Sequence, residues 1–397
     1  MRSLSVTASA VVSAMGCGGQ ATLTALRTRA GKLLPCDFAD VTDGYIGRVE
    51  GLEAHRLRRD LARFECRNNR LADLTLRTDG FSEAVAEARD TYGPDRMAVI
   101  LGTSTAGILE GEDAYRRRDA DGGALPDAFD YENTQDLFSL GGFVRAALRL
   151  SGPAFVISTA CASSARSFVD AHHLIESGVC DAAVVGGVDS LCRTTLRGFA
   201  ALGLISPDPC RPCDAARAGI SIGEAGGFAL LERPGARPGV NGEFALLGYG
   251  ATSDGFHMSA PHPRGAGAIG AMRAALDRAG LAPDAIGYIN LHGTGTRAND
   301  AMEDIAVSEV FGASVPCSST KAWSGHTLGA SGILEAVIAG LCIHNGFLPG
   351  CLGLDQVDPE FRAKVITENT PASVRHVMTN SFGFGGVNCT LILGEPT

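Results

Sequence analysis

Residues 155–165 of the chain read FVISTACASSA: an apolar run, a cysteine and then small residues. The apolar run, Ala154–Ser158, has the composition of a β-strand, and Ala162–Glu176 has the pattern of an α-helix. Cys161 is therefore predicted to lie at a strand-to-helix turn. Backbone N–H groups and the helix dipole at such a turn favour the nucleophilic thiolate and can hold an oxyanion. Taken alone, the residue also fits a buried structural cysteine.

The same alternation of strands and helices continues along the chain. The strand candidates are Leu4–Val12, Met97–Gly102, Ala154–Ser158, Ala182–Gly186, Phe244–Ala251, Ile286–Leu291, Val377–Ser381 and Cys389–Leu393. The helix candidates are Arg56–Arg70, Phe143–Leu150, Ala162–Glu176, Ile269–Ala279, Ala301–Phe311 and Leu328–Ile343. Continuous apolar strands beside helices indicate an α/β fold with largely buried sheets.

The order of these elements is approximately doubled. A strand near Met97 leads to the strand and helix around Cys161, and a strand near Ile286 leads to the helix after His326. The stretch Glu232–Gly242 contains prolines and glycines and is the expected boundary. No sharp sequence repeat is visible, so the duplication rests on element order alone.

Composition limits the possible functions. The chain has 397 residues, 45% of them hydrophobic, and a net charge of −10, which argues against whole-surface binding of nucleic acid. The 12 cysteines are scattered, as expected of reduced cytosolic thiols. Cys210 and Cys213 form a C-x-x-C without a second pair at zinc spacing, which favours a loop over a metal site.

Two apolar segments resemble targeting or membrane segments. Met1–Gly16 is interrupted by Ser and Thr and fits a strand better than a signal peptide. Ala336–Leu354 carries no Asp, Glu, Lys or Arg, but His344-Asn345-Gly346 and Pro349 interrupt it. It is predicted to be a buried helix end followed by a turn. We expect a soluble cytoplasmic protein without a membrane span.

Three further clusters carry polar side chains. They are NLHGTGT at 290–296 with His292, STKAWSGHTLGASG at 319–332 with Lys321 and His326, and NSFGFGGVN at 380–388 with Phe384. Alone, a loop histidine such as His292 is often only solvated. Together with Cys161 the clusters supply a nucleophile, two imidazoles, an ammonium group and glycine-rich backbone that can turn N–H groups toward a site. That inventory suits covalent acyl transfer with stabilisation of a carbanion.

The four clusters resemble those of the β-ketoacyl synthases that elongate acyl chains on carrier protein. The resemblance covers nearly the whole chain and includes RPCD at 211–214, GEAGG at 223–227 and TSDGFHM at 252–258. It implies a thiolase-like α-β-α-β-α sandwich that usually works as a dimer. One half would be residues 1–235 with Cys161, and the other residues 236–397 with His292, Lys321 and His326.

The resemblance also implies roles for individual residues. Cys161 would hold the acyl group as a thioester, and the N–H groups of Cys161 and Phe384 would form the oxyanion hole. His292 and His326 would stabilise the enolate that forms when malonyl-carrier protein loses CO2. This pair of histidines favours elongation over the chemistry of thiolases and of chain-starting synthases.

Other site residues match the family by position. Lys321 matches the site lysine and Glu303 its partner, although a structural salt bridge is an alternative. Thr294 and Thr296 match contacts of the phosphopantetheine arm, and Phe384 also matches a gating residue. The acyl carrier protein would supply the arm, and no metal or diffusible redox cofactor is implied.

A carrier protein is an acidic partner, and a basic helix face could bind it. Arg56, Arg59, Arg63 and Arg67 have the spacing of one helix face, with Arg70 nearby, and Arg56 and Arg59 approximately match family docking positions. A solvated helix face is the alternative. The run Arg116-Arg117-Arg118 is a second candidate.

Several positions depart from the housekeeping fatty-acid pattern. They are Asp60 in the docking segment, the short loop Ser206–Cys210, Thr105 in place of an aliphatic pocket residue, and Val387 in place of a Thr. These departures suggest a specialised synthase, for example one that builds a polyene, polyketide or pigment chain. Some such synthases pair with an inactive homologue that sets chain length, so a homodimer and that heterodimer both remain open.

Three rival functions fit the sequence less well. A non-catalytic partner subunit typically lacks the cysteine, which is present here. A cysteine hydrolase has no use for two histidines with Lys321. A scaffold protein leaves the whole set of residues unexplained.

Overall fold

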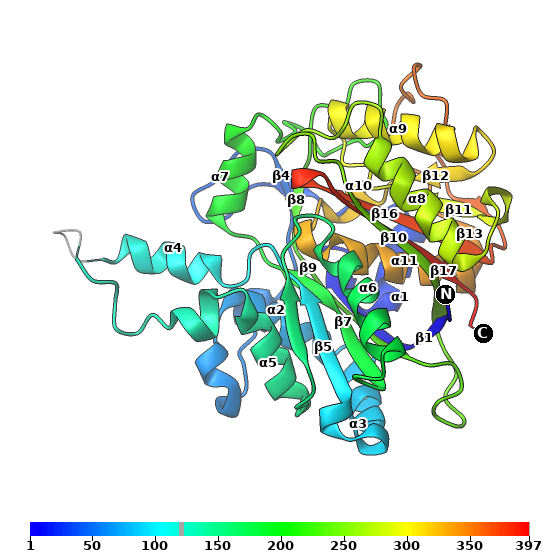
Figure 1. Ribbon diagram of the computed structural model, residues 1–397. Coiled ribbons are helices and arrows are strands. Elements are labelled where there is room, and N and C mark those ends of the chain that lie inside the picture. Colours follow the sequence, from blue (N-terminus) through cyan, green and yellow to red (C-terminus); the bar gives the residue numbers. More distant parts are fainter. Residues whose placement is uncertain (119–122, 397) are drawn as a thin grey trace.

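The computed structural model describes residues 1–118 and 123–396, and its main strands form one long mixed sheet (Figure 1). This 12-stranded sheet has the order β14-β12-β11-β16-β17-β10-β1-β9-β7-β5-β6, with β2 beside β1. The first half contributes β1 (Leu4–Ser13), β5 (Met97–Gly102), β6 (Ala154–Ile157), β7 (Ala182–Asp189) and β9 (Ala225–Glu232). The second half contributes β10 (Phe244–Ser253), β11 (Tyr288–Asn290), β12 (Pro316–Ser318), β16 (His376–Gly383) and β17 (Val387–Gly394).

The two halves repeat the same topology. In each half, the second strand is parallel to the third and fourth, and the fifth lies antiparallel between the fourth and the first. The first strands, β1 and β10, pair antiparallel at Leu4–Val6 and join the halves. Since the connection from β9 to β10 is the stretch 233–243, we propose a division into residues 1–235 and 236–397.

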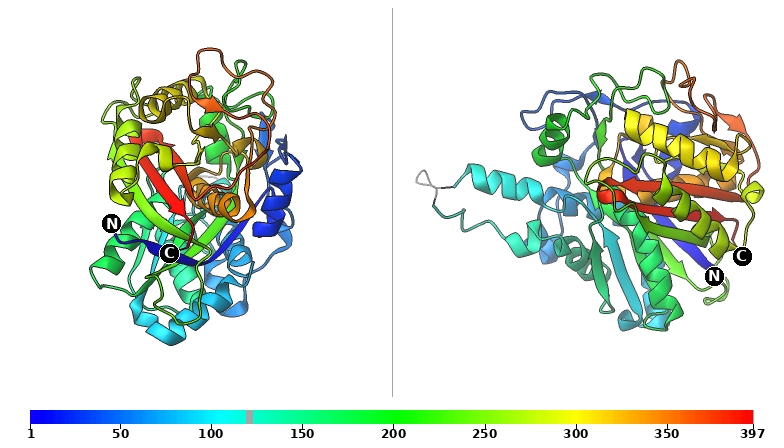
Figure 2. Two further views of the ribbon diagram at one scale, coloured as in Figure 1. Left: turned by 90° about the vertical axis from the view of Figure 1, so that its right-hand side faces the viewer. Right: turned by 45° about the horizontal axis from the view of Figure 1, so that its top comes forward.

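Helices cover the sheet in layers (Figure 2). Between the halves lie α6 (Ser163–Glu176) and α11 (Ser331–Asn345). The outer helices are α2 (Arg67–Leu76), α3 (Phe81–Tyr92) and α5 (Phe138–Leu148) on the first half, and α8 (Ala266–Ala279) and α9 (Arg297–Phe311) on the second. The result is the expected α-β-α-β-α sandwich.

The remaining α-helices and β-strands are short. They are β2 (Gly16–Cys17), β3 (Leu34–Pro35), β4 (Tyr45–Gly47), β8 (Ile222–Gly223), β13 (Phe347–Leu348), β14 (Lys364–Val365), β15 (Thr370–Pro371), α1 (Gly19–Arg27), α4 (Ile108–Arg116), α7 (Arg193–Ala201) and α10 (Lys321–Ser324). Of these, α4 projects from the body of the molecule (Figure 1).

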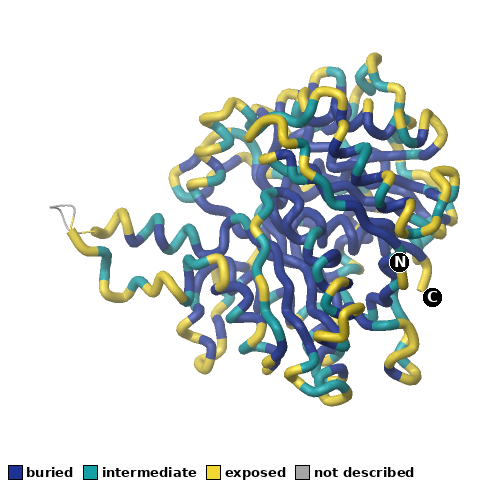
Figure 3. Tube along the Cα trace, viewed as in Figure 1, coloured by how far each residue is buried: buried dark blue, intermediate teal, exposed yellow. Residues whose placement is uncertain are grey.

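The central strands of the sheet are buried inside the protein (Figure 3). Every residue of β5 and β7 is buried, as their continuous apolar sequences predict. In the described residues, one helical segment, Leu328–Asn345, is long and apolar enough to cross a membrane, but 83% of it is buried inside the protein. It ends at Gly346 in a left-handed conformation, so the predicted buried helix end and turn are confirmed.

The helix predicted over Arg56–Arg70 is wrong. The chain forms two 3₁₀ turns, Leu52–Ala54 and Arg59–Phe64, and then starts α2 after Cys66, whose backbone is extended. The extended residue, whose sulfur caps α2, breaks the single helix. The basic face drawn from helical spacing therefore does not exist as one surface.

Candidate active site

Cys161, His292 and His326 lie together at the junction of the two halves. Cys161 follows β6 and precedes α6, His292 follows β11, and His326 precedes α11. The Nε2 atom of His326 lies 3.0 Å from the Cys161 sulfur, and the two imidazole rings are 5.2 Å apart at 81°. All three residues are buried. The predicted strand-to-helix turn at Cys161 is therefore present, and Ala160 before it has a φ of 50°.

A cavity of about 340 Å³ opens onto these residues. Its walls come from both halves of the chain. Besides Cys161 and the two histidines they include Phe199, Thr294, Thr296, Phe382 and Phe384. The hydroxyls of Thr294 and Thr296 lie 2.9 Å apart, and Thr296 also caps α9. The cavity is thus lined by apolar rings at one place and by hydroxyls at another.

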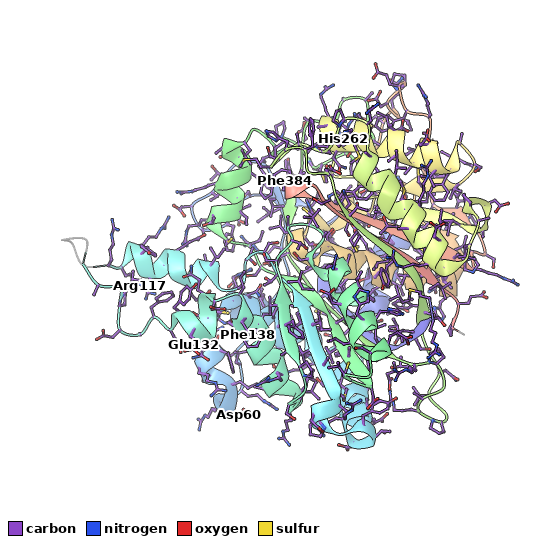
Figure 4. All side chains as sticks on the ribbon, viewed as in Figure 1. Asp60, Arg117, Glu132, Phe138, His262 and Phe384 are labelled. Carbon is purple, nitrogen blue, oxygen red and sulfur yellow. The ribbon has the colours of Figure 1, made fainter. Side chains whose placement is uncertain are left out.

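Phe384 lies beside the nucleophile through both its backbone and its ring. Its backbone N–H donates to the Cys161 sulfur. Phe384 directly follows the end of β16 (Figure 4). The centroid of its ring lies 5.7 Å from the ring centroid of Phe199 on α7. A Cβ atom on Gly383 would lie 3.1 Å from the Cys161 nitrogen, so the two strand ends approach closely because residue 383 is glycine. The N–H groups of Cys161 and Phe384 therefore lie in one small region.

The site favours neutral imidazoles and a protonated thiol. Burial, together with the Lys321 ammonium, holds the pKa of His292 and of His326 well below its usual range. Burial raises the pKa of the Cys161 thiol to about 11, against the opposing effects of Lys321 and of the Phe384 N–H. Burial therefore opposes the thiolate that the backbone N–H groups and the helix dipole are expected to favour.

Both histidines are held in one tautomer by donors at Nδ1. The Leu328 N–H donates to Nδ1 of His326, and the Lys321 ammonium lies 3.4 Å from Nδ1 of His292. Since neither donor can accept a hydrogen bond, each ring must carry its proton on Nε2. The Nε2–H group of His326 then points at the Cys161 sulfur.

Lys321 pairs with Glu335 and not with Glu303, so that part of the sequence prediction is wrong. The ammonium donates to Glu335 and to the His292 carbonyl. Glu335 lies on α11 and is the only carboxylate in that helix. A single acid in an otherwise apolar helix was the signal that would have identified it, because a buried charge needs a partner.

Glu303 instead holds the loop that carries His292. Its two oxygens accept the N–H groups of His292 and Gly293, both at 2.8 Å, and Asn380 donates to it as well. Burial raises the pKa of Glu303 to about 7. Asp300 accepts the next N–H groups of the loop, from Thr294 and Gly295. Glu303 and Asp300 therefore hold the backbone of the loop that carries His292, and neither carboxylate lines the cavity.

The predicted docking arginines separate into two groups. Arg56, Arg59 and Arg63 are exposed, whereas Arg67 is buried and paired with Glu224 and Glu53. Asp60 lies among the exposed residues (Figure 4). Arg116, from the second candidate run, pairs with Asp40. Of the four arginines predicted to share a helix face, Arg56, Arg59 and Arg63 are therefore exposed to a partner.

The described residues contain one group of three side chains with metal-ligand geometry. The ligand atoms of Cys161, His292 and His326 all lie within 4.8 Å of one another. A nearby Lys321 ammonium opposes a dication there. Cys210 lies elsewhere, where its thiol faces the Lys321 carbonyl.

Comparisons with known proteins agree with this geometry. The family model "Beta-ketoacyl synthase, N-terminal domain" matches residues 62–235, and "Beta-ketoacyl synthase, C-terminal domain" matches residues 244–355. A 3-oxoacyl-[acyl-carrier-protein] synthase 2 of Rhizobium meliloti is 34% identical over 100% of both chains. Nodulation protein E of the same organism is 34% identical over 75% of each.

Solved structures of similar chains include subunits of complexes. A ketosynthase in complex with its chain length factor from Xenorhabdus doucetiae has a TM-score of 0.90 and 38% identity, over 99% of this chain and 98% of that one. The ishigamide ketosynthase/chain length factor has a TM-score of 0.90 and 29% identity, over 99% of each chain. The likeness extends over both halves.

Proposed function

Because the chain belongs to the β-ketoacyl synthase family, we propose that it is an acyltransferase that joins malonyl-carrier protein to an acyl chain held on Cys161. The observation that carries this proposal is the buried set of Cys161, His292 and His326, with both Nε2–H groups fixed as donors. The reaction is a decarboxylative Claisen condensation, which lengthens fatty-acid, polyketide or polyene chains by a β-ketoacyl unit.

The first half-reaction loads the enzyme. The Cys161 sulfur attacks the thioester of acyl-carrier protein, the bond to the carrier sulfur breaks, and the proton of Cys161 leaves finally on the carrier thiol. The N–H groups of Cys161 and Phe384 hold the oxyanion of the tetrahedral intermediate. Losing one such donor typically raises a barrier by roughly 2.7–4 kcal/mol. The Nε2–H group of His326 supports the thiolate at the moment of attack.

The second half-reaction forms the new carbon–carbon bond. The Nε2–H groups of His292 and His326 donate to the thioester oxygen of malonyl-carrier protein. The bond to the carboxylate breaks, CO2 leaves, and the electron pair becomes the enolate. The enolate carbon attacks the Cys161 thioester and releases the Cys161 thiolate, which takes a proton from water to restore the resting thiol. Neutral donors suit this step because they stabilise the enolate without protonating its carbon.

The phosphopantetheine arm comes with the carrier protein and is the one prosthetic group that this reaction needs. Thr294 and Thr296 line the cavity with hydroxyls that can bind the amides of such an arm. On the outside, the exposed Arg56, Arg59 and Arg63 offer a local positive charge on a chain of net charge −10. We assign carrier docking to these three residues.

A second ketosynthase-like subunit would bind at the β6 end of the sheet. β6 has β5 as its only strand neighbour in the described sheet, and Phe155 on it is 50% exposed. Phe138, also exposed, starts α5, which packs beside β6 (Figure 4). An open edge strand with exposed rings favours pairing with another chain.

The likeness to two ketosynthases with chain length factors favours a heterodimer and a specialised product. Native mass spectrometry of the chain alone and with a co-expressed homologue separates the possibilities. A stable active homodimer would support the housekeeping form, and activity only with the homologue would support the heterodimer. We propose that the enzyme is cytoplasmic, because its described cysteines are free thiols and the chain is similar to a 3-oxoacyl-[acyl-carrier-protein] synthase.

Intact mass measurement tests the proposed reaction. The protein is incubated with a panel of acyl-carrier proteins and then with malonyl-carrier protein. An acyl mass on Cys161 that malonyl-carrier protein discharges with release of CO2 would support the function and identify the preferred chain. No loading from any carrier protein, even with a homologue added, would overturn it.

A further inference from the structure

Asp189 is a fully buried carboxylate beneath the active site, at the end of β7. Its Oδ1 atom accepts the Thr103 hydroxyl at 2.7 Å, the Ser104 N–H at 2.8 Å, and the N–H and hydroxyl of Thr105, both at 2.9 Å. Its Oδ2 atom accepts the Gly329 N–H at 2.6 Å. One side chain therefore connects three segments that are distant in sequence.

Two of these segments lead directly to the reacting groups. Gly329 lies three residues after His326, in the turn before α11. The Ser104 hydroxyl donates to the carbonyl of Ala160 at 3.4 Å, next to Cys161. Asp189 is thus linked to His326 through one segment and to Cys161 through the other, and the link crosses between the two halves.

The backbone around these links is strained. Ala160 before Cys161 has a φ of 50°, and Leu328 before Gly329 has a φ of 52°. Non-glycine residues in this region of φ are strained and persist only where neighbouring contacts hold them. A Cβ atom on residue 329 would lie 2.8 Å from Asp189 Oδ2, so glycine is required for the contact.

The hydrogen bonds define the charge of Asp189. The Thr103 hydroxyl accepts the Ala106 N–H, and the Thr105 hydroxyl accepts the Ser190 N–H. Both hydroxyl protons therefore point at Asp189. Burial raises the pKa of Asp189, and the hydrogen bonds from Thr103, Ser104 and Thr105 oppose that rise. Since all five groups donate, the carboxylate acts only as an acceptor, as its ionised form does. This negative charge raises the pKa of the Cys161 thiol.

We infer that Asp189 is a positioning residue that holds His326 against Cys161. Its Oδ2 atom accepts the Gly329 N–H, and its Oδ1 atom fixes the loop of residues 103–105. This inference rests on the proposed function, because the geometry it protects is that of the decarboxylation step. Asp189 itself does not line the cavity that opens onto Cys161.

Asp189→Asn tests the inference with a nearly unchanged shape. The amide oxygen can stay with the four donors on the Oδ1 side, which places the amide N–H groups against the Gly329 N–H. We expect decarboxylation of malonyl-carrier protein to fall by on the order of 10- to 100-fold, as small misplacements of reacting groups do. KM for the carrier protein should change little, and acyl loading, in which His326 only supports the thiolate, should fall less than decarboxylation. Alkylation of Cys161 by iodoacetamide should shift to lower pH, because the nearby negative charge is gone.

Asp181→Asn is the matched control, since Asp181 directly precedes β7 but lies at the exposed end and pairs with Arg96. It should leave all readings at wild-type values. Thr105→Val keeps the charge and the Gly329 link and should give a smaller loss in the same direction.

Wild-type decarboxylation in Asp189→Asn would overturn the inference. So would an equal loss of loading and decarboxylation with no shift in alkylation, which is the result of simple unfolding. If wild-type protein fails to decarboxylate, the proposed function fails, while the alkylation shift still reports the position of the Asp189 charge.

Discussion

Lys321 and Glu335 form an ion pair in which each side chain is only 2% exposed. Removing one member of such a pair leaves a buried charge and typically costs about 3–5 kcal/mol, whereas replacing both by apolar groups is often neutral. We expect Glu335→Leu to lower the free energy of unfolding by about that amount. Lys321→Met with Glu335→Leu should recover stability in urea titrations but not decarboxylation, because the donor to His292 Nδ1 is lost. Full activity of the double variant would show that this donor is dispensable.

Cys161→Ala should abolish the acyl-enzyme and retain decarboxylation of malonyl-carrier protein. The two histidines and their donors do not depend on the sulfur, so the enolate can still form and then take a proton from water. Intact mass and CO2 release measure the two activities separately. Chain elongation by this variant would rule out Cys161 as the nucleophile.

His292→Ala should load acyl groups but lose most decarboxylation. The variant removes one of two donors to the enolate oxygen, a change expected to slow the step by about 10²–10³-fold. His344→Ala is the matched control, because His344 lies at the far end of α11 with its ring against the Gly340 carbonyl. Unchanged condensation in His292→Ala would remove that residue from the mechanism.

The pH dependence of decarboxylation follows from the lowered histidine pKa values. The neutral imidazole is the active form, and a lowered pKa means that activity is lost only as pH falls well below 6.5. In Cys161→Ala, where no thiol titrates at the site, the rate should be level between pH 6.5 and 8. Acid loss centred at or above pH 6.5 would contradict the buried, neutral assignment. In wild-type protein, alkylation of Cys161 should rise toward pH about 11.

Carrier docking at the exposed arginines predicts an effect on binding alone. Arg59→Glu with Arg63→Glu should raise KM for acyl-carrier protein several-fold, leave kcat unchanged and weaken the salt dependence of the rate. Arg375→Glu with Lys364→Glu is the charge-matched control, on two exposed residues outside the proposed surface, of which the Arg375 side chain is 79% exposed. Equal effects of both changes would indicate net charge and not a docking site.

The four motif clusters could be predicted from sequence because each is a continuous run whose residues act from one loop. The supports of these loops could not be predicted in the same way. Glu335 lies 14 residues from Lys321, and Asp189 lies 140 residues from Gly329, so only the folded chain reveals either contact. The balance between burial and the helix dipole at Cys161 likewise depends on solvent exclusion, which no local pattern records.

The segment Arg56–Arg70 has apolar residues at helical spacing but does not form one helix. Leu57, Leu61 and Phe64 are buried at helical intervals, yet they belong to 3₁₀ turns and the extended link around them. The doubled order of elements was visible in outline, but its exact correspondence needed strand pairing, since β9 and β12 are not marked by a distinctive pattern of their own.

Because the two halves repeat one topology, Cys161 and His326 occupy equivalent positions in them. Each follows the third strand of its half and precedes the helix of the middle layer, and the two side chains meet across the seam. The loop of the first half therefore supplies the nucleophile of the site, and the equivalent loop of the second half supplies one of its imidazoles.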